Sequence, residues 1–441
     1  FDRLAAEDRR GCYGRAAAWF ADHGQYQEAA RHALAAGDES LAVAHVSQCL
    51  LDIAREGRLA DAHEWIKRLP ASAMARDVRV QIAEAWITAL GEDAANVPRL
   101  IEQIERHPQF NADSRFDVAL ITAAAAVFRD KPGDVAEALR DWDSAPPGAT
   151  PLNVVSLANS YAVLALQREE NEQVRRRLLT SVSSARRETG MRLPLAFADL
   201  LVGLSHLMDG NAGQAVSVLQ GRLEVAERET GRRSSPAAML AGALAAPRMV
   251  RGEPEQALAA LVDRTDEIAR IDLPDPTMLA YRTLAAIAMR RGEETRALEI
   301  LSALYQFGVT RDLPRVLLVS LTEQVRLHSV QGRAETAFEL LAQVDALRTV
   351  FDTPAYQPFD WLYRRTRSVA AGYACLARSD LEGAELALRT AVDVPIHARR
   401  APMVLVARAL LALVIHERQR PEAREMLAEV LSLADLGGIR S

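Results

Sequence analysis

Histidines and acidic residues are the first candidates for metal or catalytic chemistry in this 441-residue sequence. None of the nine histidines belongs to a His-Glu-x-x-His motif, and neither His63-Glu64 nor His416-Glu417 has a second histidine at the spacing that a zinc site needs. Asp263, Asp266 and Glu267 would share one helical face, an arrangement that binds magnesium in some helical enzymes. No second acidic cluster accompanies them, so we interpret them as a solvated surface. The sequence therefore predicts no catalytic residues, no metal site and a protein that is not an enzyme.

The cations of the sequence exclude two further classes of function. Lys67 and Lys131 are the only lysines among 53 basic residues, and no Gly-Lys pair occurs, so the phosphate-binding loop of nucleoside triphosphatases is absent. A net charge of −6 argues against general binding of nucleic acid. Three widely separated cysteines form no disulfide framework, which favours a reducing cytoplasm, and no apolar run is long enough to cross a membrane.

Arginines beside aromatic residues offer a candidate for ligand binding. Trp361 and Tyr363 are followed closely by three arginines, Arg364, Arg365 and Arg367. Guanidinium groups next to aromatic rings suit sugars, carboxylates or phosphates. We take Trp361 and Arg365 as candidate ligand-binding residues. The alternative, in which the rings pack in the core and the arginines face solvent, stays open.

Two independent markers, a series of prolines and a series of glycines that becomes regular from Gly210, recur at intervals near 40 residues and predict a structural repeat. Proline suits the first turn of a helix because its φ is already fixed there. A glycine with positive φ ends a helix and reverses the chain. In three consecutive units the glycine follows the proline by 16 residues, so each unit is predicted to be a helical hairpin. The prolines are 151, 194, 236, 276, 314, 358 and 402; the glycines, each with alanine five residues later, are 24, 37, 57, 133, 210, 252, 292 and 332, and Ser379 continues the series.

The hairpins predict an all-α fold, a solenoid that winds into a right-handed superhelix of the tetratricopeptide (TPR) type. In that motif a small residue lies in the first helix, seven positions before the turn glycine, where the two helices cross. Gly203, Ala245, Ala285 and Gly372 occupy this position here. Stacked units of this kind form a concave groove.

The composition also suggests how the chain is divided. The loop over 141–151 has the strongest turn composition of the sequence, and the repeats are regular only after it. We therefore predict a connecting helical segment over 1–70, divergent helical repeats over 71–150 and the main superhelix over 151–441. The repeat register predicts that the groove contains Asn159, Arg282, Thr322, Arg326 and Tyr373, which with Trp361 and Arg365 are the candidate ligand contacts. Plain solvated surface is the alternative for these groove positions.

Two segments near the start resemble a known family. Arg15–Asp38 and Arg55–Pro70 closely resemble the helical segment of MalT-like, LuxR-type large transcriptional regulators. In that family an NTPase and winged-helix portion precedes this segment, a TPR-like superhelix acts as the sensor, and a helix-turn-helix lies at the C-terminus. The resemblance implies that this sequence is the sensor region, which binds an inducer or a regulatory protein and controls self-association and transcription activation by the full-length protein.

The same resemblance implies which activities lie elsewhere. ATP binding and DNA binding would belong to the NTPase and helix-turn-helix portions, and neither motif is found here, so we expect no cofactor in this sequence. The sequence begins at Phe1 without an initiator methionine, and we expect it to be a piece of a longer protein. A TPR-type scaffold that binds a protein partner without any small-molecule inducer is the alternative; it shares the solenoid but not the Arg15–Pro70 signature.

Overall fold

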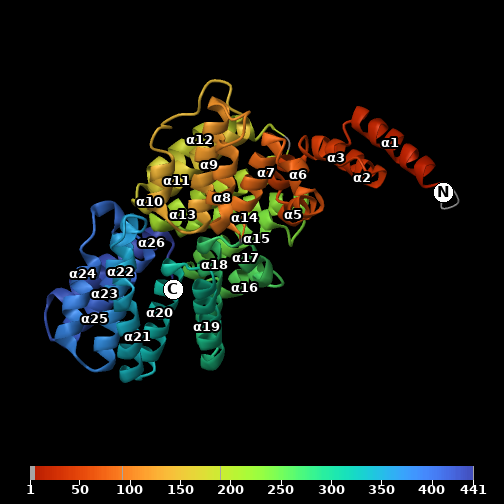
Figure 1. Ribbon diagram of the computed structural model, residues 1–441. Coiled ribbons are helices and arrows are strands. Elements are labelled where there is room, and N and C mark those ends of the chain that lie inside the picture. Colours follow the sequence, from red (N-terminus) through yellow and green to blue (C-terminus); the bar gives the residue numbers. More distant parts are fainter. Residues whose placement is uncertain (1–4, 92, 189, 441) are drawn as a thin grey trace.

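The computed structural model describes residues 5–91, 93–188 and 190–440, and every regular element in these ranges is a helix (Figure 1). The predicted all-α solenoid is therefore confirmed. The helices before the regular repeats are α1 (Ala6–Asp22), α2 (Tyr26–Ala36), α3 (Glu39–Val46), α4 (Leu50–Arg55), α5 (Leu59–Arg68), α6 (Ala71–Met74), α7 (Val78–Ala89), the 3-10 turn η1 (Ala94–Asn96), α8 (Val97–Glu105), α9 (Ala112–Phe128) and α10 (Pro132–Ala138).

The regular repeats follow as helical hairpins, in which consecutive helices pack against each other. Their elements are α11 (Pro151–Gln167), α12 (Asn171–Ala185), α13 (Arg192–Met208), α14 (Ala212–Thr230), α15 (Ser235–Val250), α16 (Pro254–Leu261), α17 (Thr265–Ile271), α18 (Pro274–Arg290), α19 (Glu294–Thr310), α20 (Pro314–Val330), α21 (Ala334–Ala346), α22 (Arg348–Phe351), η2 (Gln357–Phe359), α23 (Asp360–Ala377), α24 (Leu381–Val392), η3 (Ile396–Ala398), α25 (Pro402–Glu417) and α26 (Glu422–Gly437).

The two sequence markers take the roles that were predicted for them in most repeats. Pro151 and Pro314 are the first residues of α11 and α20. Gly210, Gly252 and Gly292 have φ values of 70°, 76° and 75°, and each follows the first helix of its unit. A residue with a Cβ atom rarely adopts this conformation, so the glycines reverse the chain at the point where each hairpin turns.

Two positions depart from the predicted pattern. Gly133 is not a turn residue, because it lies inside α10 and the positive φ of that turn, 57°, belongs to Asp130. Gly133 is instead needed for a close approach: a Cβ atom there would lie 2.2 Å from the carbonyl oxygen of Pro354. Asp263 precedes α17 with a φ of 61°, so it does not share a helical face with Asp266 and Glu267.

The small residues at the helix crossings have the predicted packing role. A Cβ atom on Gly203 would lie 2.4 Å from Cγ of Leu219, and one on Gly372 would lie 2.7 Å from the side chain of Leu388. Leu219 and Leu388 are both fully buried, on the second helices α14 and α24. The glycines therefore let the two helices of each hairpin approach closely.

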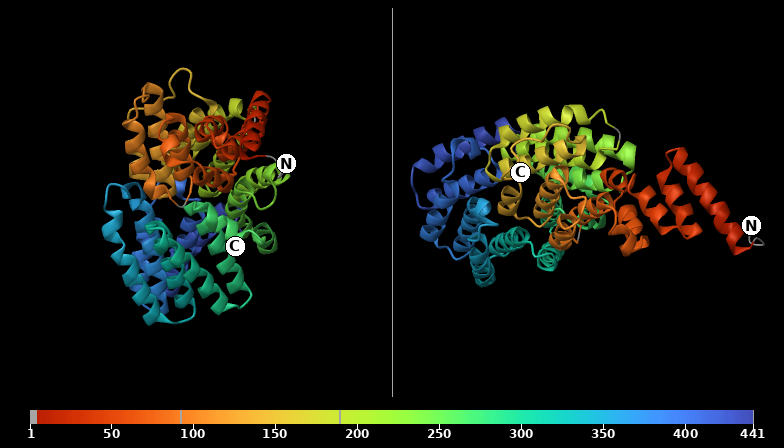
Figure 2. Two further views of the ribbon diagram at one scale, coloured as in Figure 1. Left: turned by 45° about the vertical axis from the view of Figure 1, so that its right-hand side comes forward. Right: turned by 45° about the horizontal axis from the view of Figure 1, so that its top comes forward.

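The superhelix curls until its late repeats return to its early ones, as the views in Figure 2 show for the helices near residues 130–210 and those after 350. The backbone N–H of Gly133 donates to the carbonyl oxygen of Ala355 at 2.9 Å, and that of Arg440 donates to Val250 at 2.9 Å. At the other end, α1–α3 project away from this body, whereas α4 contacts α7 and α13 (Figure 1). The predicted boundaries at residues 70 and 150 stay predictions. No helix within the described ranges combines the length and apolar character of a membrane span.

The crossing at Gly203 generates a stability prediction. We expect Gly203→Ala to lower the free energy of unfolding by about 1–3 kcal/mol, because the added methyl group collides with the buried Leu219. Gly221→Ala is the matched control, since Gly221 lies in α14 with open space around the added Cβ, and we expect it to raise stability by about 0.5–1 kcal/mol. Urea unfolding followed by circular dichroism measures both. Stabilisation by both substitutions would contradict the close crossing.

Candidate ligand-binding site

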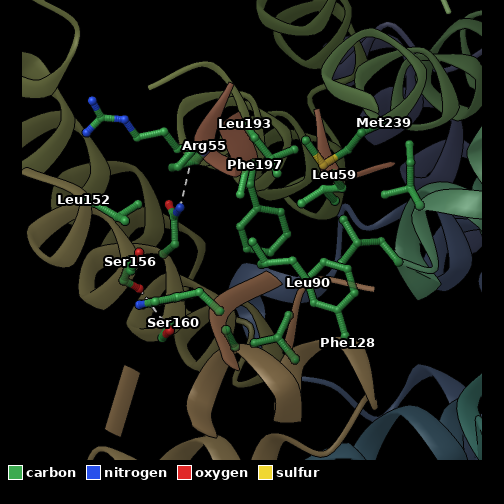
Figure 3. A pocket seen from close by; sticks show the side chains of 18 of the residues that line it. Arg55, Leu59, Leu90, Phe128, Leu152, Ser156, Ser160, Leu193, Phe197 and Met239 are labelled. Carbon is green, nitrogen blue, oxygen red and sulfur yellow. Dashed lines mark hydrogen bonds between the residues drawn. The ribbon is translucent and has the colours of Figure 1, made fainter. Parts of the chain in front are cut away.

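An apolar cavity lies where α4 and α5 meet the first helices of the repeats (Figure 3). It holds about 790 Å³ of empty volume, part of which is open to solvent. A mostly apolar lining with a few polar groups is typical of small-molecule sites. Fifteen of its 19 lining residues are non-polar, and the remaining four are Arg55, Ser156, Asn159 and Ser160. The full lining is Leu51, Ala54, Arg55, Leu59, Trp86, Leu90, Ala124, Val127, Phe128, Leu152, Ser156, Asn159, Ser160, Leu193, Pro194, Phe197, Met239, Ile271 and Leu273.

Three polar atoms of the lining residues are buried without a hydrogen-bond partner among the described residues: Oδ1 of Asn159, Nε1 of Trp86 and Nε of Arg55. The side-chain amide of Asn159 donates through Nδ2 to the carbonyl oxygen of Pro194 at 3.0 Å, which leaves Oδ1 without a donor. The indole Nε1 of Trp86 likewise has no acceptor. In contrast, the Ser160 hydroxyl is satisfied, because it donates to the carbonyl oxygen of Ser156 at 3.0 Å. Buried polar groups normally have hydrogen-bond partners, so these atoms are hydrogen-bonding positions that the described chain itself leaves unfilled.

Arg55 supplies the charge in the cavity wall. Its Nη2 lies 3.0 Å from a carboxylate oxygen of Asp52, so the guanidinium charge is already neutralised within α4. The Nε atom of Arg55 is buried and has no hydrogen-bond partner in the described ranges. The site is therefore apolar and close to neutral, with one acceptor and two donors left in its wall.

The other predicted site residues lie outside this cavity, and three of them gather around Glu323. Arg282 donates through Nε and Nη2 to Oε1 of Glu323 at 2.9 and 2.6 Å, and Arg326 donates through Nε to Oε2 at 2.8 Å. Burial alone raises the pKa of Glu323, but the two guanidinium groups outweigh it and lower that pKa to about 2. Burial raises the pKa of Tyr373, which is near enough to Arg326 for the guanidinium to oppose that rise. The Thr322 hydroxyl faces its own helix and donates to the carbonyl oxygen of Leu318 at 2.8 Å.

Trp361 and Arg365 hold the superhelix closed. Arg365 donates through Nη1 and Nη2 to the carboxylate of Glu169 at 2.7 and 3.1 Å, and these residues are 196 positions apart. The Arg365 guanidinium lies 4.7 Å from the centre of the Trp361 ring, and the indole N–H donates to the carbonyl oxygen of Gln167 at 2.6 Å. The aromatic and arginine pair therefore does bind a carboxylate, but one supplied by the chain itself.

A second contact closes the superhelix through a buried cation. Arg315 donates to Asp130 at 2.9–3.0 Å and to Asp275 at 2.7 and 2.9 Å. Arg315 and Asp130 are almost completely buried and are 185 positions apart. Burial raises the pKa of Asp130 to about 6 although Arg315 opposes that rise, while the two carboxylates raise the pKa of Arg315. We call Asp130, Asp275 and Arg315 the closing triad.

The seven predicted site residues thus occupy separate places. Asn159 lines the cavity, and Trp361 and Arg365 lie at the closure. Arg282, Arg326 and Tyr373 lie around Glu323, next to which Thr322 bonds to its own helix. Trp86 and Arg55 were not predicted for the cavity. Both lie before the regular repeats, on α7 and α4, where no repeat register relates a residue to the concave face. Among the described residues no group of three or more His, Cys, Asp or Glu is placed to hold a metal ion.

Comparisons with known proteins relate parts of this chain to larger proteins. No protein-family model matches the sequence. The chain is 30% identical over 167 residues to the serine/threonine-protein kinase PknK of Mycobacterium tuberculosis, which covers 36% of this chain and 15% of the kinase. It is 32% identical over 91 residues to the HTH-type transcriptional regulator AlkS of Ectopseudomonas oleovorans, which covers 20% of this chain and 10% of the regulator. The chain thus spans about a seventh or less of the length of these relatives.

Solved structures agree in fold. The Rap protein complexed with Competence and Sporulation Factor superposes with a TM-score of 0.59 at 12% identity, over 82% of this chain and 99% of Rap. The APC/C hetero-tetramer Cut9-Hcn1 gives a TM-score of 0.54 at 16% identity, over 98% of this chain and 82% of its own. The chain is therefore a TPR-like helical-repeat solenoid. Within that class, part of it is similar in sequence to an HTH-type transcriptional regulator.

The closing triad generates a pH-dependent prediction. We expect Arg315→Leu to lower the free energy of unfolding by about 3–5 kcal/mol at pH 7.5, because Asp130 then stays buried and charged without its cation. The pKa of Asp130 is raised above its unfolded value, so folding takes up a proton between about pH 4 and 6. The loss should therefore be smaller at pH 5, where Asp130 is neutral. Arg296→Leu, which removes an exposed pair with Glu299, is the control and should cost under about 1 kcal/mol at either pH.

For Glu323 we expect the stability to depend on pH in the opposite direction. Its pKa is held below the unfolded value, so its contribution to stability is full above about pH 4.5 and is lost as the pH falls toward 2. We expect Glu323→Gln to cost about 2–3 kcal/mol at pH 7 and clearly less at pH 3. Glu339→Gln, on the exposed face of α21, is the control. Chemical denaturation at the two pH values measures both, and a cost that is independent of pH would contradict the ion-pair account.

Proposed function

We propose that this chain is the signal-sensing region of a LuxR-type transcriptional regulator with MalT-like organisation. It binds an inducer or a regulatory protein, and the bound state controls self-association and transcription activation by the full-length protein. The observation that carries this proposal is the cavity, because its wall joins α4 and α5 to the first helices of the repeats. A ligand there contacts both parts of the chain at once. The partial similarity to the AlkS regulators supports the regulatory role.

In this proposal the region binds and transmits a signal, does no catalysis and needs no cofactor of its own. ATP binding and DNA binding belong to other segments of the full-length protein, and the setting is the cytoplasm. The kinase similarity does not bring a kinase site with it, because the sequence contains neither a His-Arg-Asp nor an Asp-Phe-Gly motif.

Side chains of the cavity wall also lie next to the closing triad. A smaller cavity of about 360 Å³ is lined by Asp130, Asp275 and Arg315 of the closing triad. Val127 of α9 and Phe197 of α13 line both cavities. A ligand that fills the larger cavity presses on these two side chains, and they contact the space next to the triad. Ligand binding thereby biases the curl of the superhelix through direct packing.

A protein partner is the second candidate signal, and one observation favours it. The Rap structure that superposes on this chain is a complex with Competence and Sporulation Factor, so a solenoid of similar fold can hold a bound factor. In this chain the pair of arginines around Glu323 offers charged groups to such a partner. A partner bound there would leave the apolar cavity without a role in the response.

The cavity assignment is tested by filling it. We expect Ala124→Phe, on the cavity wall, to abolish inducer-dependent transcription by the full-length protein and the ligand-induced rise in Tm of this chain. The control is Ala303→Phe on the exposed face of α19, which should preserve both responses. A reporter assay and a thermal-shift screen of small molecules measure the two effects.

The small-molecule proposal is contradicted if Ala124→Phe responds to the inducer over the same concentration range as the unmodified protein. If Arg282→Ala then removed the response and a stoichiometric protein co-purified with the chain, the partner alternative would replace it. Circular dichroism before each assay establishes that the variants keep the helical fold.

A further inference from the structure

Resting on the proposed function, we infer the chemical class of the ligand from the cavity wall. The ligand is an uncharged, largely apolar molecule with one hydroxyl or similar group, which accepts a hydrogen bond from Nε1 of Trp86 and donates one to Oδ1 of Asn159. The proposal rests on two of the three lining atoms that are buried and have no partner within the described chain; the third, Nε of Arg55, belongs to a guanidinium group that already pairs with Asp52.

The two atoms form a complementary pair. Trp86 can only donate a hydrogen bond through its indole nitrogen, and the Asn159 oxygen can only accept one. A buried polar atom without a partner lowers the stability of the fold, and natural proteins keep few of them. Here a donor and an acceptor of this kind occur in the wall of one cavity, on α7 and α11, and α9 contacts both helices. A hydroxyl group is both a donor and an acceptor, so its chemistry matches both atoms.

The orientation of Asn159 is set by the fold. Its Nδ2 donates to the carbonyl oxygen of Pro194, so exchanging the two ends of the amide would place oxygen against oxygen. The oxygen therefore stays on the unpartnered side. Only 5% of Asn159 and 3% of Trp86 is exposed, so bulk water does not compete for these atoms. A ligand group that reaches them gains hydrogen bonds in a dry site, where such bonds are strongest.

The rest of the lining excludes charged and strongly polar ligands. Among the described lining residues Arg55 alone is ionised, and Asp52 already pairs with it, so an anion would have to compete with that carboxylate. A cation would find no carboxylate in the wall. A sugar would leave most of its hydroxyl groups against leucine, phenylalanine and other apolar side chains, at the cost of burying them unpaired. An apolar body with a single polar head fits all of the lining.

The test uses three probes of similar size and one calorimetric assay on this chain. 1-Octanol both donates and accepts, heptyl methyl ether only accepts, and octanoate carries a negative charge. We expect octanol to bind, and octanoate to bind at least about tenfold more weakly. Asn159→Leu should weaken octanol roughly tenfold and leave the ether within about twofold, since only octanol donates to Oδ1. Trp86→Phe should weaken both octanol and the ether, because both accept from Nε1.

Controls separate hydrogen bonding from packing. Trp142→Phe makes the same substitution outside the cavity, where Trp142 packs on Phe116, and should leave all three affinities unchanged. If Asn159→Leu does not fold, Asn159→Ala takes its place in the same cycle. The inference is wrong if Asn159→Leu weakens octanol and the ether equally, if Trp86→Phe changes neither, if octanoate binds best, or if octanol does not bind the unmodified chain.

The outcomes distinguish this inference from the proposed function. Octanol that fails to bind, together with an inducer response that Ala124→Phe removes, overturns the ligand class and leaves the sensing cavity standing. Octanol that binds with the expected pattern, together with transcription that is indifferent to Ala124→Phe, overturns the proposed function and leaves the binding site standing.

Discussion

A guanidinium group cannot be buried without anions around it, and this requirement shapes the whole molecule. Arg315 is almost completely buried, and the carboxylates that neutralise it come from the turn after α9 and from the start of α18. Asp130 and Arg315 are 185 positions apart, so they meet only if the solenoid curls back on itself. In an open superhelix water would hydrate both groups, but once the curl buries them neither can lack the other, because an unpaired buried charge is strongly destabilising. The pair therefore fixes the place at which the closed superhelix meets itself, in addition to the stacking of hairpins.

The cavity forms within the first part of the chain, because all of its lining residues lie between Leu51 and Leu273. In an extended solenoid the first helices of the repeats present their concave faces to water, and apolar residues there would be exposed. Here α4 packs against α7 and α13, so Leu51 and Leu59 cover a concave face that also contains Phe197 and Met239. The helices do not fill the space between these side chains completely. The same packing that shields the apolar face leaves a pocket inside it, with Asn159 turned toward a backbone carbonyl on the neighbouring helix.

Local features of the fold could be predicted from the sequence because their causes are local. Pro314 begins a helix and Gly210 ends one through their own backbone preferences, and Gly203 makes room for the second helix of its own hairpin. Gly133 shows where this reasoning stops. It carries the same spacing to an alanine as the turn glycines, but its reason is the carbonyl oxygen of Pro354, far along the chain. A single glycine does not reveal which of the two reasons applies.

The difference between local and long-range causes also explains which site residues could be predicted from the sequence. Trp361 and Arg365 have the local chemistry of a carboxylate site, and the carboxylate that Arg365 binds is Glu169, 196 positions earlier. Asn159 was reachable through the repeat register, whereas Trp86 lies before the register begins. Each of these two residues has a buried polar atom without a hydrogen-bond partner in the rest of the described chain. Such an atom can be recognised only once the packing is known. A ligand shifts the fold only as far as it prefers one curl over another. Val127 and Phe197 line both the larger cavity and the smaller one beside the closing triad, so in the proposed function they connect ligand binding to the curl.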